Sequence, residues 1–304
     1  MRLRLALLAA LVPLLCAAPA GARYRVGIGE QDAAMFASPA WQGLRLRLVR
    51  YIVPWDWYEA GQQAEVSAFM RAARANGQDV LVTFTSRRGC YDGLRYSRDA
   101  ACRAPSASAY RAAFRLFDDA YPWVRTYSAW NEVNHVSQPT FGQPRLAVRY
   151  YDVLRRESRR RRFRVMAADV LDTANMAPYL RSFLRLAPGR PRLWGLHNYQ
   201  DVNRHTSLDT HDMLATVPGE VWLTETGAIV RLGDSPQWGY SEARAADRTR
   251  WMFTLARRTR IARLFVYKWF GAPAGARFDA GLVNADGGAR PALAVLRGIA
   301  AAHR

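Results

Sequence analysis

The stretch VWLTETG, residues 221–227, is a short apolar run that ends on a carboxylate and a glycine. Near-continuous apolar runs of this length are typical of strands that are buried on both faces of a parallel sheet. A carboxylate at the end of such a strand is costly unless it has partners or chemistry to perform. The stretch therefore predicts a buried strand that delivers Glu225 to a functional site.

Seven other runs share this strand character and alternate with helical patterns. Val66, Phe69, Met70 and Ala73, for example, recur at helical spacing, and the pattern stops at Asn76-Gly77. Strict alternation of strands and helices predicts a parallel sheet. With residues 221–225, the expected strands are Tyr24–Gly29, Leu46–Val53, Val80–Thr85, Thr126–Trp130, Phe163–Val170, Leu193–Tyr199 and Arg263–Trp269.

Eight such units fit a closed (β/α)8 barrel, which takes roughly 250 residues, or about 31 per unit. The rival is a doubly wound open sheet that binds a dinucleotide. Its Gly-x-Gly-x-x-Gly fingerprint begins at Gly27 and Gly29 but fails at Asp32. The chain shows no linker or diagnostic repeat. The sequence therefore predicts an α/β fold, a single (β/α)8 TIM barrel over residues 23–304.

The first 22 residues have the pattern of a secretory signal peptide. Arg2 and Arg4 precede an apolar stretch, Leu5–Ala18, which leads to small-x-small cleavage patterns. We therefore expect a secreted protein, extracellular or periplasmic, with no stable membrane insertion. Removal of this segment leaves two cysteines, Cys90 and Cys102, and in an oxidising compartment such a pair predicts a disulfide.

The net charge of +19 comes almost wholly from arginine, since Lys268 is the only lysine. Such a composition is explained by a GC-rich coding sequence, although a basic surface also attracts anionic polymers. The densest cluster, Arg155–Arg162, ends a helix, where arginine favours the negative end of the helix dipole. We expect no nucleic-acid partner and a monomer.

Several chemistries lack their motifs. The five histidines include no His-Glu-x-x-His, and no Cys-x-x-Cys is present, so a zinc site has no ligand set. Neither a Gly-x-Ser-x-Gly elbow nor a phosphate-binding loop occurs. We therefore expect no metal and no organic cofactor.

A second carboxylate, Glu132, ends the expected strand at 126–130. It precedes Glu225 by 93 residues, which is three barrel units of about 31. Because active sites of such barrels lie at the carboxyl ends of the strands, the two side chains should meet across the barrel mouth. Two facing carboxylates are what glycoside hydrolysis needs, one as acid and one as nucleophile. Two structural ion pairs with arginine are the alternative.

With these motifs the sequence resembles the clan A glycoside hydrolases, retaining enzymes built on (β/α)8 barrels. Asn131-Glu132 resembles the clan's fourth-strand Asn-Glu, which implies Glu132 as acid/base and Asn131 as a contact of the sugar 2-hydroxyl. The 221–227 segment resembles the seventh strand, which implies Glu225 as nucleophile. Val133 departs from the Pro that many members have after the acid/base.

Four further positions carry the same resemblance. His197-x-Tyr199 is similar to the clan's sixth-strand His-x-Tyr, whose tyrosine hydrogen-bonds the nucleophile. Arg50 matches a second-strand arginine near the nucleophile. Trp269 matches an eighth-strand tryptophan that forms the floor of the subsite for the cleaved sugar. All four are expected to contact substrate or the catalytic pair.

Aromatic residues in the expected loops support a sugar substrate. Trp55 and Trp57 follow the second strand, and aromatic faces stack on the apolar faces of sugar rings. The sequence thus predicts a secreted retaining β-glycoside hydrolase acting on a poly- or oligosaccharide. The alternatives are a catalytically inactive carbohydrate-binding barrel and a basic surface protein that binds anionic polymers.

Overall fold

The protein is described here by a computed structural model covering residues 24–302, apart from residues 60, 92–94 and 234–235. The expected signal peptide, residues 1–22, lies outside the described residues. No helix within the described ranges combines the length and the apolar character needed to span a membrane.

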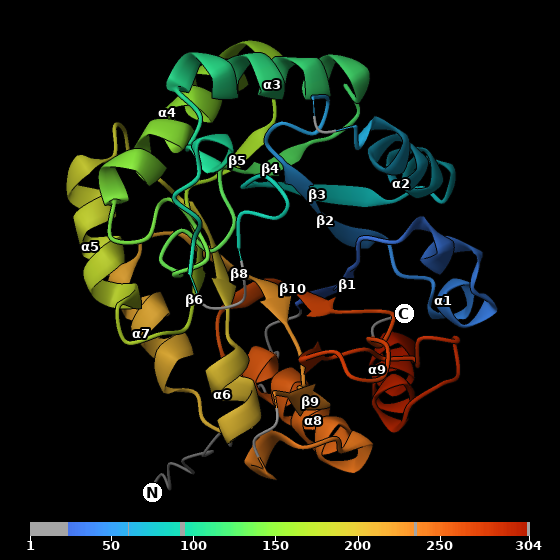
Figure 1. Ribbon diagram of the computed structural model, residues 1–304. Coiled ribbons are helices and arrows are strands. Elements are labelled where there is room, and N and C mark those ends of the chain that lie inside the picture. The colour runs from blue at the N-terminus through green and yellow to red at the C-terminus, as the bar shows by residue number, and fades with distance from the viewer. Residues whose placement is uncertain (1–23, 60, 92–94, 234–235, 303–304) are drawn as a thin grey trace, which may run out of the picture.

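The strands form one parallel sheet that curls into a nearly closed barrel (Figure 1). All eight expected strands are present, and the fifth is divided into β5 (Arg164–Met166) and β6 (Asp169–Leu171). These halves stand at the two ends of the sheet order β5-β4-β3-β2-β1-β10-β8-β7-β6. Backbone bonds from Ala167 to Leu193 and from Gly195 to Ala168 join them to the neighbouring strand. The predicted (β/α)8 barrel is therefore confirmed.

The other barrel strands lie within two residues of the expected bounds, and β4, β7 and β10 each stop two residues earlier than expected. They are β1 (Arg25–Gly29), β2 (Leu48–Pro54), β3 (Asp79–Thr85), β4 (Thr126–Ser128), β7 (Leu193–His197), β8 (Glu220–Thr226) and β10 (Ile261–Tyr267).

Helices surround the sheet because each has one apolar face to bury (Figure 1). In the helix at 107–120, for example, Tyr110, Phe114 and Phe117 are buried, and the Ser106 side chain accepts a hydrogen bond from the Ala109 N–H at its start. The α-helices are α1 (Pro39–Leu44), α2 (Gln63–Ala75), α3 (Ala107–Ala120), α4 (Pro144–Arg161), α5 (Met176–Leu186), α6 (Tyr199–Arg204), α7 (Leu208–Thr216), α8 (Glu242–Arg258) and α9 (Pro291–Ala302).

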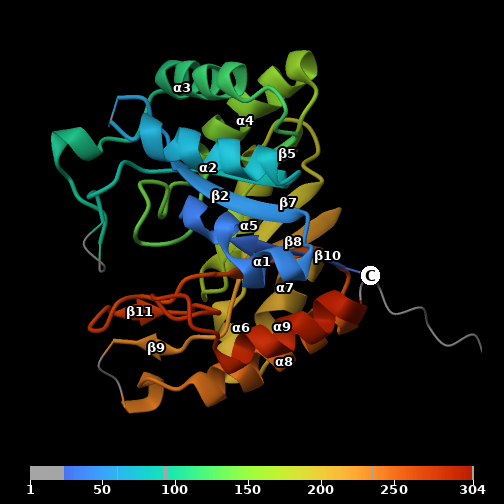
Figure 2. The ribbon, with the colours of Figure 1, turned by 90° about the vertical axis from the view of Figure 1, so that its right-hand side faces the viewer.

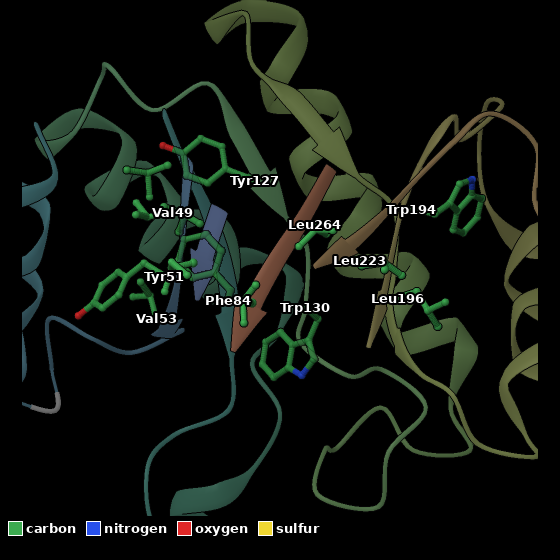
Figure 3. Packing of buried hydrophobic residues seen from close by; sticks show 14 of the residues in the cluster. Val49, Tyr51, Val53, Phe84, Tyr127, Trp130, Trp194, Leu196, Leu223 and Leu264 are labelled. Carbon is green, nitrogen blue, oxygen red and sulfur yellow. The ribbon is translucent and has the colours of Figure 1, made fainter. Parts of the chain in front are cut away.

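The core has two parts. A large cluster lies between sheet and helices, where Phe84 and Tyr127 from neighbouring strands stack at a centroid distance of 6.3 Å (Figure 3). A second cluster of Leu48, Leu81, Met166, Leu193, Trp222 and Phe265 comes from six different strands. Leu48 and Leu193 begin β2 and β7, so this layer fills the barrel interior on the side of the amino ends and leaves the carboxyl ends for chemistry.

Long loops occupy the carboxyl ends of the strands. The loop after β3 is closed by a disulfide between Cys90 and Cys102, as predicted. A two-stranded antiparallel ribbon, β9 (Arg231–Leu232) with β11 (Phe278–Asp279), lies to the left in Figure 2, beyond the barrel strands.

The first and last barrel strands, β1 and β10, are joined to each other, and a further set of bonds links them at their carboxyl ends. β1 pairs with β10 over its full length, from Arg25 with Arg263 to Gly29 with Tyr267. Just beyond β1, the buried carboxylate of Glu30 accepts the backbone N–H groups of residues 31, 32, 269 and 270 at 2.7–3.2 Å. One side chain thus fixes the exits of both strands.

Candidate active site

Glu225 is delivered by β8, one residue before the strand ends. Its Oε2 accepts a hydrogen bond from Arg50 Nη1 at 2.7 Å, and its Oε1 accepts one from the Tyr199 hydroxyl at 2.9 Å. Arg50 is fully buried on β2, and Tyr199 begins α6 directly after β7. The Glu225 side chain is 10% exposed. Side chains from β2 and from the start of α6 therefore hold the carboxylate from β8 in a defined orientation, and it keeps access to solvent.

Glu132 lies in the turn that follows β4. Its backbone is left-handed, with φ of 44°, a conformation that costs a non-glycine residue about 1–2 kcal/mol. Such strained positions are often retained where they aim a functional side chain. Oε1 lies 3.0 Å from His197 Nδ1, and an oxygen of Glu132 lies within 4.8 Å of one of Glu225. The structure therefore brings the two predicted carboxylates together.

Asp169 is a third carboxylate in this network, and no motif of the sequence pointed to it. It is fully buried at the start of β6, between Arg50 Nη2 at 3.0 Å and His197 Nε2 at 3.1 Å. Its Oδ1 also accepts a hydrogen bond from the Thr224 hydroxyl. Asp169 thus orients both cations that contact the two glutamates.

Gly195 on β7 makes room for this arrangement. A Cβ atom at this position would lie within 2.7 Å of a side-chain atom of Asp169, Met166 and Thr224. Any other residue at 195 would therefore displace the carboxylate that holds Arg50.

The charges of the network determine where its protons reside. Burial lowers the pKa of His197, but the carboxylates of Asp169 and Glu225, with hydrogen bonds to Asp169 and Glu132, raise it to about 10. Burial raises the pKa of Glu132, but its hydrogen bond to His197 and that cation's charge outweigh burial and lower it. At neutral pH the imidazole therefore holds the proton between the two side chains, and Glu132 is ionised.

Asp172, just beyond β6, is buried against the helix that carries Tyr199. Its Oδ2 accepts the backbone N–H of Asp201 at 3.0 Å, and Oδ1 has no hydrogen-bond partner among the described residues. Burial raises the pKa of Asp172 and the Asp201 N–H lowers it, while the carboxylates of Asp209 and Asp201 raise it further, to about 8.

This shift predicts a loss of stability as pH rises. Between about pH 4 and pH 8 the folded chain holds a proton on Asp172 that the unfolded chain has released, so the free energy of unfolding falls across this window. Asp172→Asn removes the ionisation but keeps the shape. Denaturant unfolding at several pH values should give the wild type a steeper decline than the variant, by at most about 1.4 kcal/mol per pH unit. Parallel curves for the two proteins would contradict the prediction.

Trp269 was predicted to line the sugar subsite, and this is wrong. Its side chain is fully buried and packs edge-on against Trp41 at 6.0 Å. β10 ends at Tyr267, so the position two residues earlier takes the place at the barrel mouth. Burial and the charges of Glu225 and Glu30 raise the pKa of the Tyr267 hydroxyl. Tyr267 is therefore the half-buried aromatic residue at the end of the eighth strand.

Three other residues predicted to contact substrate are buried, namely Trp57, Arg50 and His197, whereas Trp55 stays a prediction. Trp57 is 7% exposed and packs against Phe117 and Tyr121, so it belongs to the core rather than to a binding surface. Trp55 is half-buried against the same core and keeps an exposed part. Arg50 and His197 are fully buried, so they contact the glutamates and not the solvent from which a substrate enters.

Asn131 lies beside Glu132 and is 8% exposed. Its Oδ1 accepts a hydrogen bond from Arg50 Nη2 at 2.6 Å. This bond turns the amide nitrogen away from the arginine.

Glu132, His197 and Glu225 each offer a ligand atom within 4.8 Å of the others, a spacing that suits a metal ion. Arg50 donates to Glu225 at 2.7 Å, however, and its charge opposes a cation at the same oxygens. The donor set is therefore a poor fit for a metal, and we assign none to it.

Comparison with protein-family models and with curated protein sequences finds no match. Solved structures with a similar fold include a GH5_18 variant from Streptomyces cattleya in complex with Manβ1-4GlcNAc, at 17% identity and a TM-score of 0.68, covering 93% of this chain and 80% of that one. A variant of an endo-β-1,4-glucanase from Xanthomonas axonopodis pv. citri is similar at 15% identity and a TM-score of 0.61. The match covers 91% of this chain and 99% of that one.

A family 39 glycoside hydrolase from Bacteroides cellulosilyticus is also similar, with 13% identity and a TM-score of 0.59. The match covers 90% of this chain but only 63% of that structure, so the chain spans less than two thirds of its length. These similarities show the (β/α)8 barrel fold that the sequence predicted.

Proposed function

We propose that this protein is a secreted retaining glycoside hydrolase that cleaves a β-linked poly- or oligosaccharide by double displacement. The observation that carries the proposal is the approach of Glu132 and Glu225 to within 4.8 Å. Retaining enzymes hold their carboxyl groups about 5–5.5 Å apart, whereas inverting enzymes leave about 6.5–9.5 Å for a water molecule. The short separation favours direct attack by one carboxylate.

Glu225 acts as the nucleophile in this proposal. Arg50 and Tyr199 each bind one of its oxygens, which fixes the carboxylate for attack on the anomeric carbon. A covalent glycosyl-enzyme results, and the Arg50–Asp169 pair behind it limits the movement of the guanidinium while the charge on Glu225 is consumed.

Glu132 serves as acid and then as base. His197 holds the proton that it shares with Glu132. When the leaving oxygen is protonated by Glu132, this proton moves from His197 Nδ1 to Glu132 Oε1 across 3.0 Å and from there to the leaving oxygen. In the second step Glu132 removes a proton from water, which attacks the glycosyl-enzyme. His197 is in this scheme a proton reservoir rather than a contact of substrate.

The loop that follows Glu132 borders a cavity whose lining residues include neither glutamate. This cavity of about 1080 Å³ lies between the disulfide-closed loop and the loop after Glu132, and its lining includes Tyr96, Arg98 and Phe141. Phe141 and the nearby Tyr91 are exposed, and Tyr91 contacts His135, which lies 3.6 Å from Glu132. Aromatic side chains beside the acid/base suit a sugar on the leaving-group side. The disulfide supports export to an oxidising compartment.

The test is the configuration of the first product. Purified protein is screened against a panel of β-linked glycans, and the best substrate is followed by proton NMR from the first minutes of reaction. The β-anomer should form first and then mutarotate. An initial α-anomer would refute retention, and binding without cleavage of any glycan would favour the inactive carbohydrate-binding barrel.

A further inference from the structure

Arginines surround the end of the barrel that is opposite to the candidate site. Barrel strands begin there, and six of the eight strand positions carry an arginine at or just before the first paired residues. The strand register places several of them side by side. Arg25 of β1 is opposite Arg263 of β10, and the Arg164 N–H donates a backbone hydrogen bond to the Arg125 carbonyl. We call this set the arginine ring: Arg25, Arg47, Arg125, Arg164, Arg192, Arg260 and Arg263.

The ring has a large excess of positive charge. The carboxylates at the same strand starts are Asp79 and Glu220, which already bind Arg263 at 2.9 Å and Arg164 at 2.7 Å. Across the part of the chain that the structure describes, no ion pair joins Arg25, Arg192 or Arg260 to a carboxylate. Burial and the charges of Arg25 and Arg164 lower the pKa of Arg263 despite its bond to Asp79.

Helix ends add to the same face, since helices in this fold end where strands begin. Their last turns carry Arg159, Arg160 and Arg161 in α4 and Arg257 and Arg258 in α8. The helix dipole explains arginine at these positions. It does not explain the arginine ring, because strands have only small net dipoles.

Part of the ring is held in place around a cleft. Arg164, Arg192 and Arg260 line an open cavity of about 600 Å³ together with Glu220. Trp222, which closes the barrel interior, supports Arg164 at 5.0 Å and Arg263 at 4.2 Å through cation–π contacts. These guanidinium groups are therefore oriented before any ligand binds, which lowers the entropic cost of binding.

We propose that the arginine ring is a docking surface for an anionic membrane surface, with the cleft between Arg164, Arg192 and Arg260 receiving a phosphate-bearing headgroup. The charges encircle a barrel end instead of following a groove, so they match a plane of phosphates better than a linear polymer. The large exposed apolar side chains among the described residues are Tyr91, Leu116, Phe141, Leu208, Leu232 and Tyr240, none of which is at the amino end of a barrel strand. Binding is thus electrostatic, and the candidate site faces away from the membrane.

The test is co-sedimentation of the purified chain with vesicles of phosphatidylcholine and phosphatidylglycerol in equal parts. The wild type should bind these vesicles and dissociate from them at high salt. It should not bind vesicles of phosphatidylcholine alone. The triple variant Arg164→Gln, Arg192→Gln, Arg260→Gln should bind roughly 100-fold more weakly, given the contribution of each basic residue at such a surface. Its hydrolysis of a soluble glycan should equal that of the wild type, so this outcome is independent of the proposed function.

A matched control removes three exposed arginines from helices α4 and α5: Arg145→Gln, Arg149→Gln, Arg181→Gln. It should keep vesicle binding within a few-fold of the wild type. Equal weakening of both triple variants would overturn the proposal, because net charge alone would then explain binding. Tight binding of soluble polyphosphate without binding of the vesicles would also overturn it, in favour of a linear polyanion.

Discussion

In the Glu225→Ala variant, kcat on the natural glycan is expected to fall by about 10⁵-fold, because the covalent route loses its nucleophile. Glu132→Ala loses proton transfer in both steps, and a loss of roughly 10²–10⁴-fold is expected for a glycan with a poor leaving group. Glu59→Ala, at an exposed carboxylate on the same side of the barrel, is the control and should keep full activity. Initial rates on the best glycan of the panel measure all three.

The roles of the two glutamates are separated by azide and an aryl glycoside. An aryl leaving group departs with little protonation, so Glu132→Ala should form the glycosyl-enzyme and then stall for want of a base. Azide needs no base, so it should restore turnover and give the β-glycosyl azide by two inversions. Glu225→Ala allows only direct attack by azide on the substrate, which gives the α-azide.

The products identified by NMR therefore report the roles without reference to the structure. An α-azide from Glu132→Ala and a β-azide from Glu225→Ala would reverse the assignment. Full activity of both variants on the natural glycan would show that the pair is not catalytic.

Asp169→Ala is expected to destabilise the fold strongly. The change leaves Arg50 and His197 as buried cations with one carboxylate partner fewer, and breaking a buried ion pair in this way costs about 3–5 kcal/mol. Denaturant unfolding near pH 7 gives the free energy. Asp169→Asn, which keeps the shape and one acceptor, should lose less.

Asp152→Ala provides the comparison, since Asp152 binds Arg155 and Arg156 on the outer side of α4. Pairs this close to solvent contribute about 0–1 kcal/mol. If Asp169→Ala lost no more stability than this control, the buried network would not be the structural support that we infer.

The barrel and its two glutamates could be predicted because both follow from the order of apolar and charged residues over short stretches of the sequence. Buried strands are read from apolar runs, and Glu132 and Glu225 each interrupt the end of one. Asp169 carries the same signal, a carboxylate within an apolar run, but it begins the second half of a divided strand instead of ending one. The division depends on pairing with two different neighbours, which no local pattern records.

The tryptophans were harder for a different reason. Trp57 is covered by Phe117 and Tyr121, which lie some 60 residues later in the chain. The prediction for Trp269 was wrong because β10 ends two residues earlier than the apolar run suggests. The chain then turns the Trp269 side chain toward Trp41. Both errors concern which way an aromatic ring faces, and that is decided by distant packing partners.

The union of β1 and β10 through Glu30 sets the order in which this protein can fold. The bonds from Glu30 to Trp269 and Phe270 span 239 and 240 residues, among the longest sequence separations available to the chain. During synthesis the free edge of β1 has no partner until the last strand has been made. Contacts of such range form slowly because a very long loop must close first. The barrel is therefore closed only after its last strand has been made, and until then an unpaired strand edge is open to mispairing with other chains.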